Sequence, residues 1–187
     1  DIYREHGYEG ATMIAIARRL DMTAPALYWY FKSKEEILMA FLEHTIADLI
    51  AHVRARLQAQ EPARRLRQFM EAYVEWQLQQ QELSAAYERI YALGQLRNSL
   101  PEPQRQRVKA REREFYGLCE SLVAAVRGRR ERAAPGRAAL AFALIGMVEH
   151  LIAWYRPNGK LSVRQIARLY GDLALAMVKS GAVASRV

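Results

Sequence analysis

Residues 12–34 constrain the fold more than any other part of this sequence of 187 residues. Thr12 stands immediately before a run of apolar residues and is a side chain that can cap a helix N-terminus. The apolar residues that follow are spaced i, i+3, i+4 and i+7, which places them on one helical face: Met13, Ile16, Ala17 and Leu20. The spacing predicts a short amphipathic helix that begins at Thr12.

A second short helix is predicted directly after a turn at Asp21 and Met22. Thr23 can cap it, and Pro25 falls in its first turn, where a missing N–H costs little. Leu27 and Phe31 are expected to point into the core of this segment. Two short helices joined by a turn of three or four residues form a helix-turn-helix, and its second helix enters the major groove of DNA.

A third helix is predicted from the S-x-x-E capping box at residues 33–36. It continues into a long helix whose apolar stripe has steps of three and four: Ile37, Leu38, Phe41, Thr45, Ile46, Leu49, Val53 and Leu57. Pro62 disfavours helix at Glu61, so the long helix is expected to end there.

The pattern G-[YF]…T…IA…L…[ST]-x-x-x-LY-x-[YH]-F-x-x-K resembles the DNA-binding domain of the TetR family of bacterial transcriptional repressors. Its positions in this sequence are Gly7, Tyr8, Thr12, Ile16, Ala17, Leu20, Thr23, Leu27, Tyr28, Tyr30, Phe31, Lys34 and Leu38. One departure is Asp21, where the family often has glycine. Asp tolerates a positive φ better than most residues, so a left-handed turn is still expected.

The resemblance implies a DNA-contacting set on the two short helices and at the start of the third. Thr12 and Lys34 lie where the family contacts DNA phosphates, and Tyr28 and Tyr30 flank the same DNA backbone. The second helix offers few side chains that could form hydrogen bonds to bases. Much of the specificity is therefore expected from DNA shape. The alternative is that Tyr28 or Trp29 is a core aromatic. The expected DNA-binding residues are Thr12, Thr23, Ala24, Pro25, Ala26, Tyr28, Trp29, Tyr30 and Lys34.

The net charge of +8 does not by itself indicate DNA binding, because the basic excess lies outside the helix-turn-helix. Residues 1–45 hold five basic and seven acidic residues, whereas residues 97–137 hold eleven basic and five acidic ones. The DNA prediction therefore rests on the motif and not on the isoelectric point.

The remainder of the chain is predicted to be helical as well, with segments separated by Gly and Pro. The expected segments are 64–81, 82–93, 104–126, 137–155 and 162–180, the last capped by Ser162. Along 104–126, only Arg111 is expected to interrupt an apolar seam. The prediction is an all-α fold of about nine helices. A three-helix DNA-binding head at 1–45, with the start of its first helix missing from the sequence, precedes an effector-binding and dimerisation bundle at 46–187.

Bulky side chains concentrate in the bundle and are expected to line an effector pocket, although an ordinary packed core is the alternative for any one of them. Met70, Tyr116 and Trp154 belong to the wider group. The expected pocket residues are Phe69, Tyr73, Trp76, Tyr87, Tyr91, Phe115, Cys119, Met147 and Leu151. Such a wall suits a hydrophobic or amphipathic small molecule.

Two tracts, 105–118 and 146–161, resemble the bodies of TetR regulators that respond to acyl-CoA thioesters. The positive charge of residues 97–137 supplies a physical reason, because the phosphates of CoA need cations. The alternative is that these cations form a solvated helix face. A regulator of efflux that senses another lipophilic molecule is the alternative function.

A homodimer is expected through the helices 137–155 and 162–180, because so small a head needs two half-sites about 34 Å apart on DNA. In the alternative, one of these helices is simply core.

Catalysis, metals and cofactors find little support in the sequence. The four histidines lack metal-binding spacing, and Cys119 has no visible partner. A helical enzyme or a partner-binding module without DNA are remote alternatives. No uncharged apolar run of about 18 residues and no signal peptide are visible, so a cytoplasmic protein without a membrane span is expected.

Overall fold

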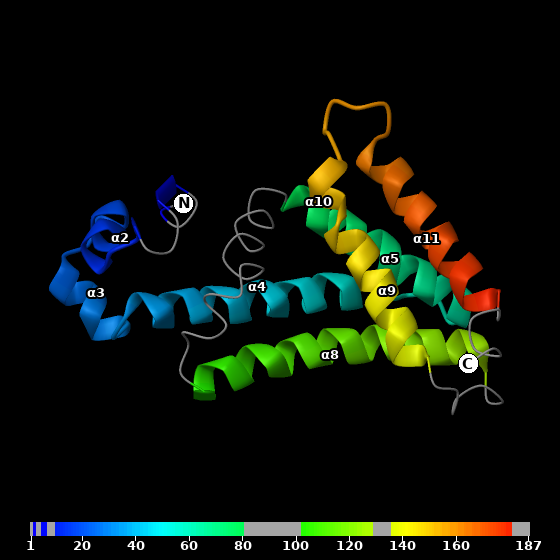
Figure 1. Ribbon diagram of the computed structural model, residues 1–187, viewed down its shortest axis with the longest axis horizontal. Coiled ribbons are helices and arrows are strands. Elements are labelled where there is room, and N and C mark those ends of the chain that lie inside the picture. Colours follow the sequence, from blue (N-terminus) through cyan, green and yellow to red (C-terminus); the bar gives the residue numbers. More distant parts are fainter. Residues whose placement is uncertain (1, 3–4, 7–9, 81–101, 129–135, 181–187) are drawn as a thin grey trace. The chain divides into compact units, whose positions relative to one another are not determined.

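The computed structural model describes residues 2, 5–6, 10–80, 102–128 and 136–180, and these are helical with no strand among them (Figure 1). The all-α prediction is confirmed for this part of the chain. The helices are α2 (Met13–Arg19), α3 (Ala24–Tyr30), α4 (Lys34–Arg56), α5 (Pro62–Gln79), α8 (Glu102–Arg127), α9 (Arg137–Glu149), α10 (Leu151–Trp154) and α11 (Val163–Lys179).

The predicted count of about nine helices is not matched by these elements. The expected helix at 82–93 lies outside the described residues, and the expected helix at 137–155 is divided into α9 and α10 at His150. His150 itself keeps helical φ and ψ angles and its N–H still donates to the Gly146 carbonyl at 3.1 Å, so the division is a local irregularity.

The chain folds as two compact units. The first contains residues 1–45 and 82–111, and the second contains residues 46–81 and 112–187. Because the boundaries fall inside α4 and α8, each of these helices contributes residues to both units.

In the first unit, the two short helices form where the caps predict. The Thr12 hydroxyl accepts a hydrogen bond from the Ala15 N–H at 3.1 Å, and the Thr23 hydroxyl accepts one from the Ala26 N–H at 3.3 Å. Asp21 has φ 52°, so the expected left-handed turn is present. The core consists of Met13, Ile16, Ala17 and Leu27, packed with Ile2, Met22, Ala24, Phe31 and Ile37.

The prediction that Leu20 lies on the apolar face of the first helix is wrong. The helix ends at Arg19, and Leu20 is the C-cap with ψ of 9°, so its exposed side chain no longer follows the helical face. The side chain of Met22 instead packs against the core.

The predicted long helix forms as α4 but ends at Arg56, five residues before Glu61. Its buried face is wider than the predicted stripe because it includes Met39, Leu42 and Ile50. Glu61 begins the next helix: its carboxylate accepts hydrogen bonds from the N–H groups of Ala63 and Arg64 at 2.9 and 2.8 Å. These bonds favour the ionised form and lower the pKa of Glu61.

In the second unit, α11 packs along α5 more extensively than any other pair of helices in the described part (Figure 1). The predicted apolar side of α11 contains Ile166, Leu169, Tyr170, Leu173 and Met177. In the single chain Leu169 and Leu173 are exposed, whereas Ile166 and Tyr170 are buried together with smaller residues: Ala167, Gly171 and Ala174. Small residues allow the two helix backbones to approach closely.

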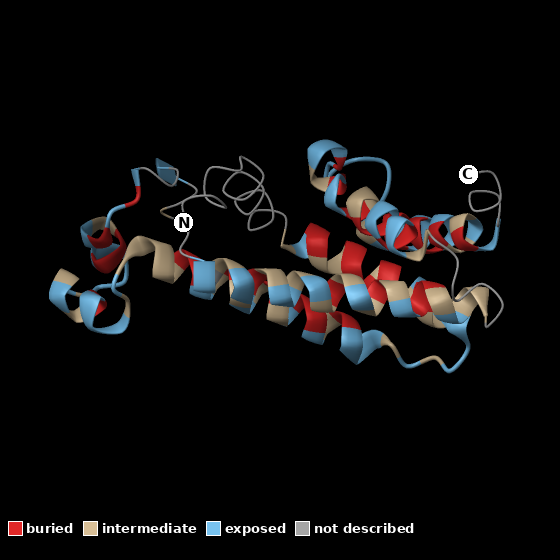
Figure 2. Cartoon of the chain, turned by 60° about the horizontal axis from the view of Figure 1, so that its bottom comes forward, coloured by how far each residue is buried: buried red, intermediate tan, exposed pale blue. Residues whose placement is uncertain are grey.

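Helix α8 also has a buried face, and Figure 2 colours the buried residues of the chain red. Its buried side chains are Val108, Phe115, Cys119, Leu122 and Val123. Arg111 is exposed, so it does not interrupt the buried seam.

Helix α9 carries apolar side chains nearly all round, and in the single chain Phe142 is 60% exposed. Residues 137–154 are long and apolar enough to cross a membrane by length and composition alone, with Arg137 at the start of the stretch and Glu149 within it. A core helix passes the same test, and Leu144, Ile145 and Val148 are fully buried here.

Candidate functional site

The expected DNA-contacting residues lie along one segment of the first unit, from the start of α2 to the start of α4. Thr12 and Thr23 are exposed N-caps, and Lys34 is the first residue of α4 and half-buried. Helix N-termini carry partial positive charge and N–H donors, which suit phosphate oxygens. The segment thus presents the N-termini of α2, α3 and α4 close together in sequence.

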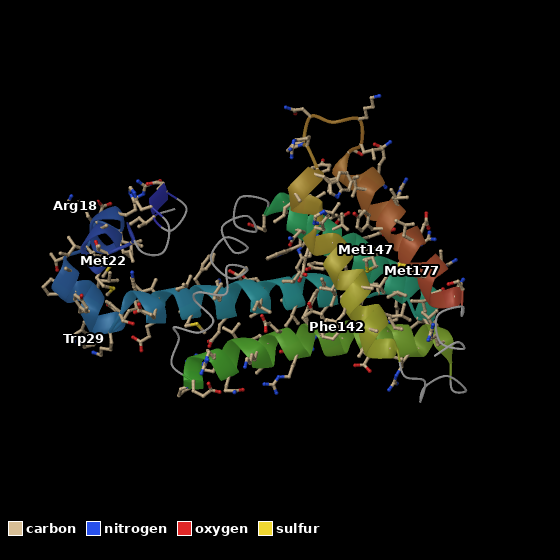
Figure 3. All side chains as sticks on the ribbon, in the orientation of Figure 1. Arg18, Met22, Trp29, Phe142, Met147 and Met177 are labelled. Atoms are coloured by element: carbon tan, nitrogen blue, oxygen red, sulfur yellow. The ribbon has the colours of Figure 1, made fainter. Side chains whose placement is uncertain are left out.

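The side chains of α3 that are not needed for the core are mostly accessible. Tyr28 is 46% exposed and Trp29 is 78% exposed, and the exposed Tyr30 ring lies edge-on to Trp29 with centroids 5.6 Å apart. The alternative that Tyr28 or Trp29 is a core aromatic is therefore wrong. Pro25 is exposed, whereas Ala24 and Ala26 are half-buried. Figure 3 labels Trp29 on this helix.

Two arginines at the end of α2 are candidates for additional base readers. Both are exposed, and Arg19 donates a hydrogen bond to Glu5 at 3.1 Å. Arg18 stands at the same helix end and is labelled in Figure 3. The residues of α3 include no cation, so any direct reading of bases from this helix is apolar or through Thr23.

The structure brings together three of the expected pocket residues as a cluster of aromatic rings. The centroids of Phe69 and Phe115 are 5.4 Å apart, those of Tyr73 and Phe115 are 4.9 Å apart, and those of Phe69 and Tyr73 are 6.4 Å apart. All three side chains are buried. The cluster joins α5 to α8 within the second unit.

The other expected pocket residues differ in burial. Cys119 and Leu151 are fully buried, and burial raises the pKa of the Cys119 thiol to about 12, so the group is a protonated thiol at neutral pH. Trp76 and Met147 are half-buried, and Met147 is labelled on α9 in Figure 3. Tyr87 and Tyr91 lie outside the described residues.

Sequence reasoning missed two polar features. Gln77, one turn after Tyr73, is the buried polar side chain among the described residues. Two ion pairs also join α4 to α8: Arg107 with Glu43 at 2.7 Å in the first unit, and Arg54 with Glu114 at 3.0 Å in the second. Long-range pairs of this kind have no signature in local spacing.

Tyr116 and Phe142 form a further contact, between α8 and α9, with ring centroids 4.6 Å apart. Burial, followed by the nearby carboxylates of Glu149 and Glu112, raises the pKa of Tyr116 to about 12. Phe142 points toward α8 in Figure 3, which explains how so exposed a side chain still has a fixed neighbour.

Two family models match this chain. One, described as "Bacterial regulatory proteins, tetR family", matches residues 2–41, and another, described as "Tetracyclin repressor-like, C-terminal domain", matches residues 59–178. A curated relative, the HTH-type transcriptional activator FasR of Mycolicibacterium smegmatis, is 34% identical over 77 residues, 41% of this chain. The match spans about a third (35%) of the length of that relative.

Solved structures resemble nearly the whole chain. The TetR family transcriptional regulator PfmR of Thermus thermophilus has a TM-score of 0.75 and 26% identity, with 92% of each chain covered. AibR, solved in complex with isovaleryl coenzyme A and operator DNA, has a TM-score of 0.69 and 24% identity, covering 94% of this chain and 90% of that one. The second family model alone covers more than half of the sequence, and this chain therefore belongs to the TetR family of bacterial transcriptional regulators.

Proposed function

We propose that this protein is a repressor that binds operator DNA as a homodimer and is released by an amphipathic small molecule, with an acyl-CoA thioester as the effector. The observation that carries the DNA-binding part is the exposed surface of α3, where Trp29 and its neighbours are accessible although the helix is anchored by Leu27. In this proposal residues 1–45 form the DNA-binding domain, residues 46–187 bind the effector and the partner chain, and the protein acts in the cytoplasm.

The proposed DNA contacts are those that the sequence predicts. Thr12, Thr23 and Lys34 approach phosphates, Tyr28 and Tyr30 flank the backbone, and Ala24, Pro25, Ala26 and Trp29 face base edges. Because most of these side chains are apolar, sequence preference is expected to come from thymine methyl groups and from DNA shape.

Lys34→Ala tests the phosphate contact, with Lys160→Ala in the 156–160 turn as a control that removes the same charge from the body. Operator duplexes are first selected by the wild-type protein from a random library. Losing one phosphate contact should weaken binding to all duplexes and reduce the slope of log K against log salt by about 1. If Lys34→Ala and Lys160→Ala behave alike, Lys34 makes no phosphate contact.

The homodimer is proposed to form through residues 137–155 and 162–180. In the single chain, large apolar side chains are exposed on α9, α10 and α11: Phe142, Trp154, Leu169 and Leu173. Monomers rarely leave several such side chains on neighbouring helices exposed, and a second copy would cover them. Light scattering at micromolar concentration should give twice the mass of one chain, and Leu169→Glu with Leu173→Glu should give the monomer mass.

The effector proposal combines an apolar wall with the cations of α8. The proposed wall comprises the expected pocket residues: Phe69, Tyr73, Trp76, Tyr87, Tyr91, Phe115, Cys119, Met147 and Leu151. Arginines of α8 between residues 105 and 113 would face the phosphates of CoA, and AibR was solved with isovaleryl coenzyme A. Calorimetry with a long-chain acyl-CoA and the matching free acid separates this effector from a purely lipophilic one. Heat from the CoA ester alone supports the proposal, and equal binding of the acid supports a lipophile sensor instead.

Release is proposed to occur by a shift between two conformers. The effector must bind the conformer that is unsuited to the operator more tightly than the other, because tight binding to both shifts nothing. Helix α4 extends from Lys34 at the DNA-binding segment to Arg56, and a change in its tilt would alter the spacing of the two groove helices.

A further inference from the structure

Arg107 on α8 and Glu43 on α4 form an ion pair in which the arginine is exposed and the glutamate is half-buried. The guanidinium donates to one carboxylate oxygen, Oε2, at 2.7 Å. The Arg107 side chain is 70% exposed, whereas the Glu43 side chain is 18% exposed. An anion in solution can therefore reach the Arg107 guanidinium, whereas most of the Glu43 side chain is shielded from water.

The second oxygen of Glu43 makes this pair unusual. Glu43 Oε1 is buried and has no hydrogen-bond partner among the described residues. The carboxylate therefore depends on Arg107 more than a surface carboxylate would. A buried charge that loses its partner is strongly unfavourable, far more so than an exposed pair that separates.

The ion pair joins two helices that have different proposed roles. Glu43 lies on the same helix as Lys34, the residue proposed to contact phosphate at the start of α4. Arg107 lies within the basic stretch of α8 that is proposed to face the phosphates of the effector. The pair therefore links the proposed ligand helix to the helix that leads to DNA.

We propose that Arg107 is an anion switch: it pairs with Glu43 in the DNA-binding conformer and with a phosphate of the effector in the released conformer. The inference rests on the proposed function and names how ligand phosphate is sensed. When a phosphate takes Arg107, the half-buried Glu43 loses its cation while its Oε1 remains buried. Movement of α4 that exposes Glu43 to water relieves this cost, and the movement disfavours the operator-bound geometry.

Because binding free energies are reciprocal, the same coupling requires operator DNA to weaken phosphate binding by the factor by which phosphate weakens operator binding. A residue that merely stabilised the fold would change both affinities without coupling them. Coupling is therefore the property to measure.

The test uses the full chain, an operator duplex selected by the wild-type protein, and fluorescence anisotropy. The probe is coenzyme A, with pantetheine as the analogue that lacks phosphates and with sodium chloride to match ionic strength. Coenzyme A should release the wild-type protein and pantetheine should not. Glu43→Gln keeps the side-chain size and should still bind the operator, but the coenzyme A concentration for half-release should rise at least about tenfold.

Arg107→Gln should show the converse behaviour. It leaves Glu43 without its cation, so operator affinity should fall at least about fivefold without any ligand. The double variant Glu43→Gln/Arg107→Gln removes the unpaired charge, so it should regain operator affinity and remain insensitive to coenzyme A. Glu114→Gln is the matched control, since it breaks the other ion pair between α4 and α8 and should leave half-release within about twofold of wild type.

The outcomes separate this inference from the proposed function. Equal release of wild type and Glu43→Gln overturns the switch and leaves the repressor proposal standing. Release of the wild type by pantetheine as well, or by a lipophile but not by coenzyme A, likewise overturns the switch alone. Failure of the wild-type protein to select any duplex overturns the proposed function and the switch with it.

Discussion

The ring of Phe115 on α8 stands edge-on to the ring of Tyr73 on α5, with the centroids 4.9 Å apart at an interplanar angle of 71°. Phe69 stacks on Phe115 with centroids 5.4 Å apart. Edge-to-face and offset pairs at such distances are favourable beyond the area they bury. This cluster fixes α8 against α5 in the second unit, and any effector that enters here must displace or exploit it.

Replacement of Phe115 by Ala should therefore destabilise the protein strongly. The side chain is 4% exposed, and removing a buried phenyl ring typically costs about 3–5 kcal/mol. Urea unfolding monitored by circular dichroism measures the change. Trp29→Ala is the control, because this exposed aromatic should change the free energy of unfolding by no more than about 0.5 kcal/mol. Similar losses for the two variants would contradict the core assigned to Phe115.

Two helical glycines offer a matched pair of Gly→Ala substitutions. A Cβ at Gly117 on α8 meets nothing within 4 Å, whereas a Cβ at Gly171 on α11 would lie 2.8 Å from Cγ of Arg67 on α5. Gly117→Ala should raise the free energy of unfolding by about 0.5–1 kcal/mol through helix propensity. Gly171→Ala should be less stable than Gly117→Ala by about 1–3 kcal/mol. The added methyl group has the same helix propensity, but at position 171 it overpacks the contact with Arg67.

The Gly171 comparison is measured by denaturation of both variants against the wild type. If Gly171→Ala stabilises the protein as much as Gly117→Ala, the helices α5 and α11 do not approach as closely as the structure shows. A preserved ion pair between Arg67 and Asp172 is expected in either case, since both groups are at the surface of this crossing.

Stability should depend on the protonation of His52. Burial first, and then the charge of Arg56, lower the pKa of His52, while Glu75 and a backbone hydrogen bond with Ala72 act in the opposite direction. Nε2 of this histidine is buried with no partner among the described residues. The folded protein therefore binds the proton less tightly than the unfolded chain, whose pKa is about 6.5.

It follows that the free energy of unfolding should fall as pH is lowered through about 6.5 and continue to fall until the folded pKa is reached. Urea unfolding between about pH 5.5 and 8 measures this slope. His52→Gln should flatten it, whereas the exposed control His150→Gln should not. An unchanged slope in His52→Gln would assign the acid sensitivity to another group.

The DNA-binding segment was largely predictable because its signals are local. Thr12 and Thr23 cap the helices that follow them, and Asp21 adopts the left-handed conformation that a tight turn requires. Each of these features depends on residues that are near neighbours in sequence. The Leu20 prediction failed because periodicity continued past the point where the helix ends.

The faces of α8 and α11 were less predictable because both helices carry apolar residues on more than one side. On α11 the large apolar residues Leu169 and Leu173 are exposed in the single chain. The small residues Ala167, Gly171 and Ala174 face the core because α5 crosses closely there. Which face is buried depends on partner helices that are distant in sequence. The ion pair of Glu43 with Arg107 escaped prediction for the same reason.

The central claim is that two copies of this chain bind one operator and that an acyl-CoA thioester dissociates them from it. Light scattering coupled to gel filtration on the selected operator duplex, with and without a long-chain acyl-CoA, tests this most directly. We predict two chains on a duplex with two half-sites, and free duplex plus free dimer once the thioester is added. A single chain on the duplex, or a complex of unchanged mass in the presence of every acyl-CoA tested, would contradict it.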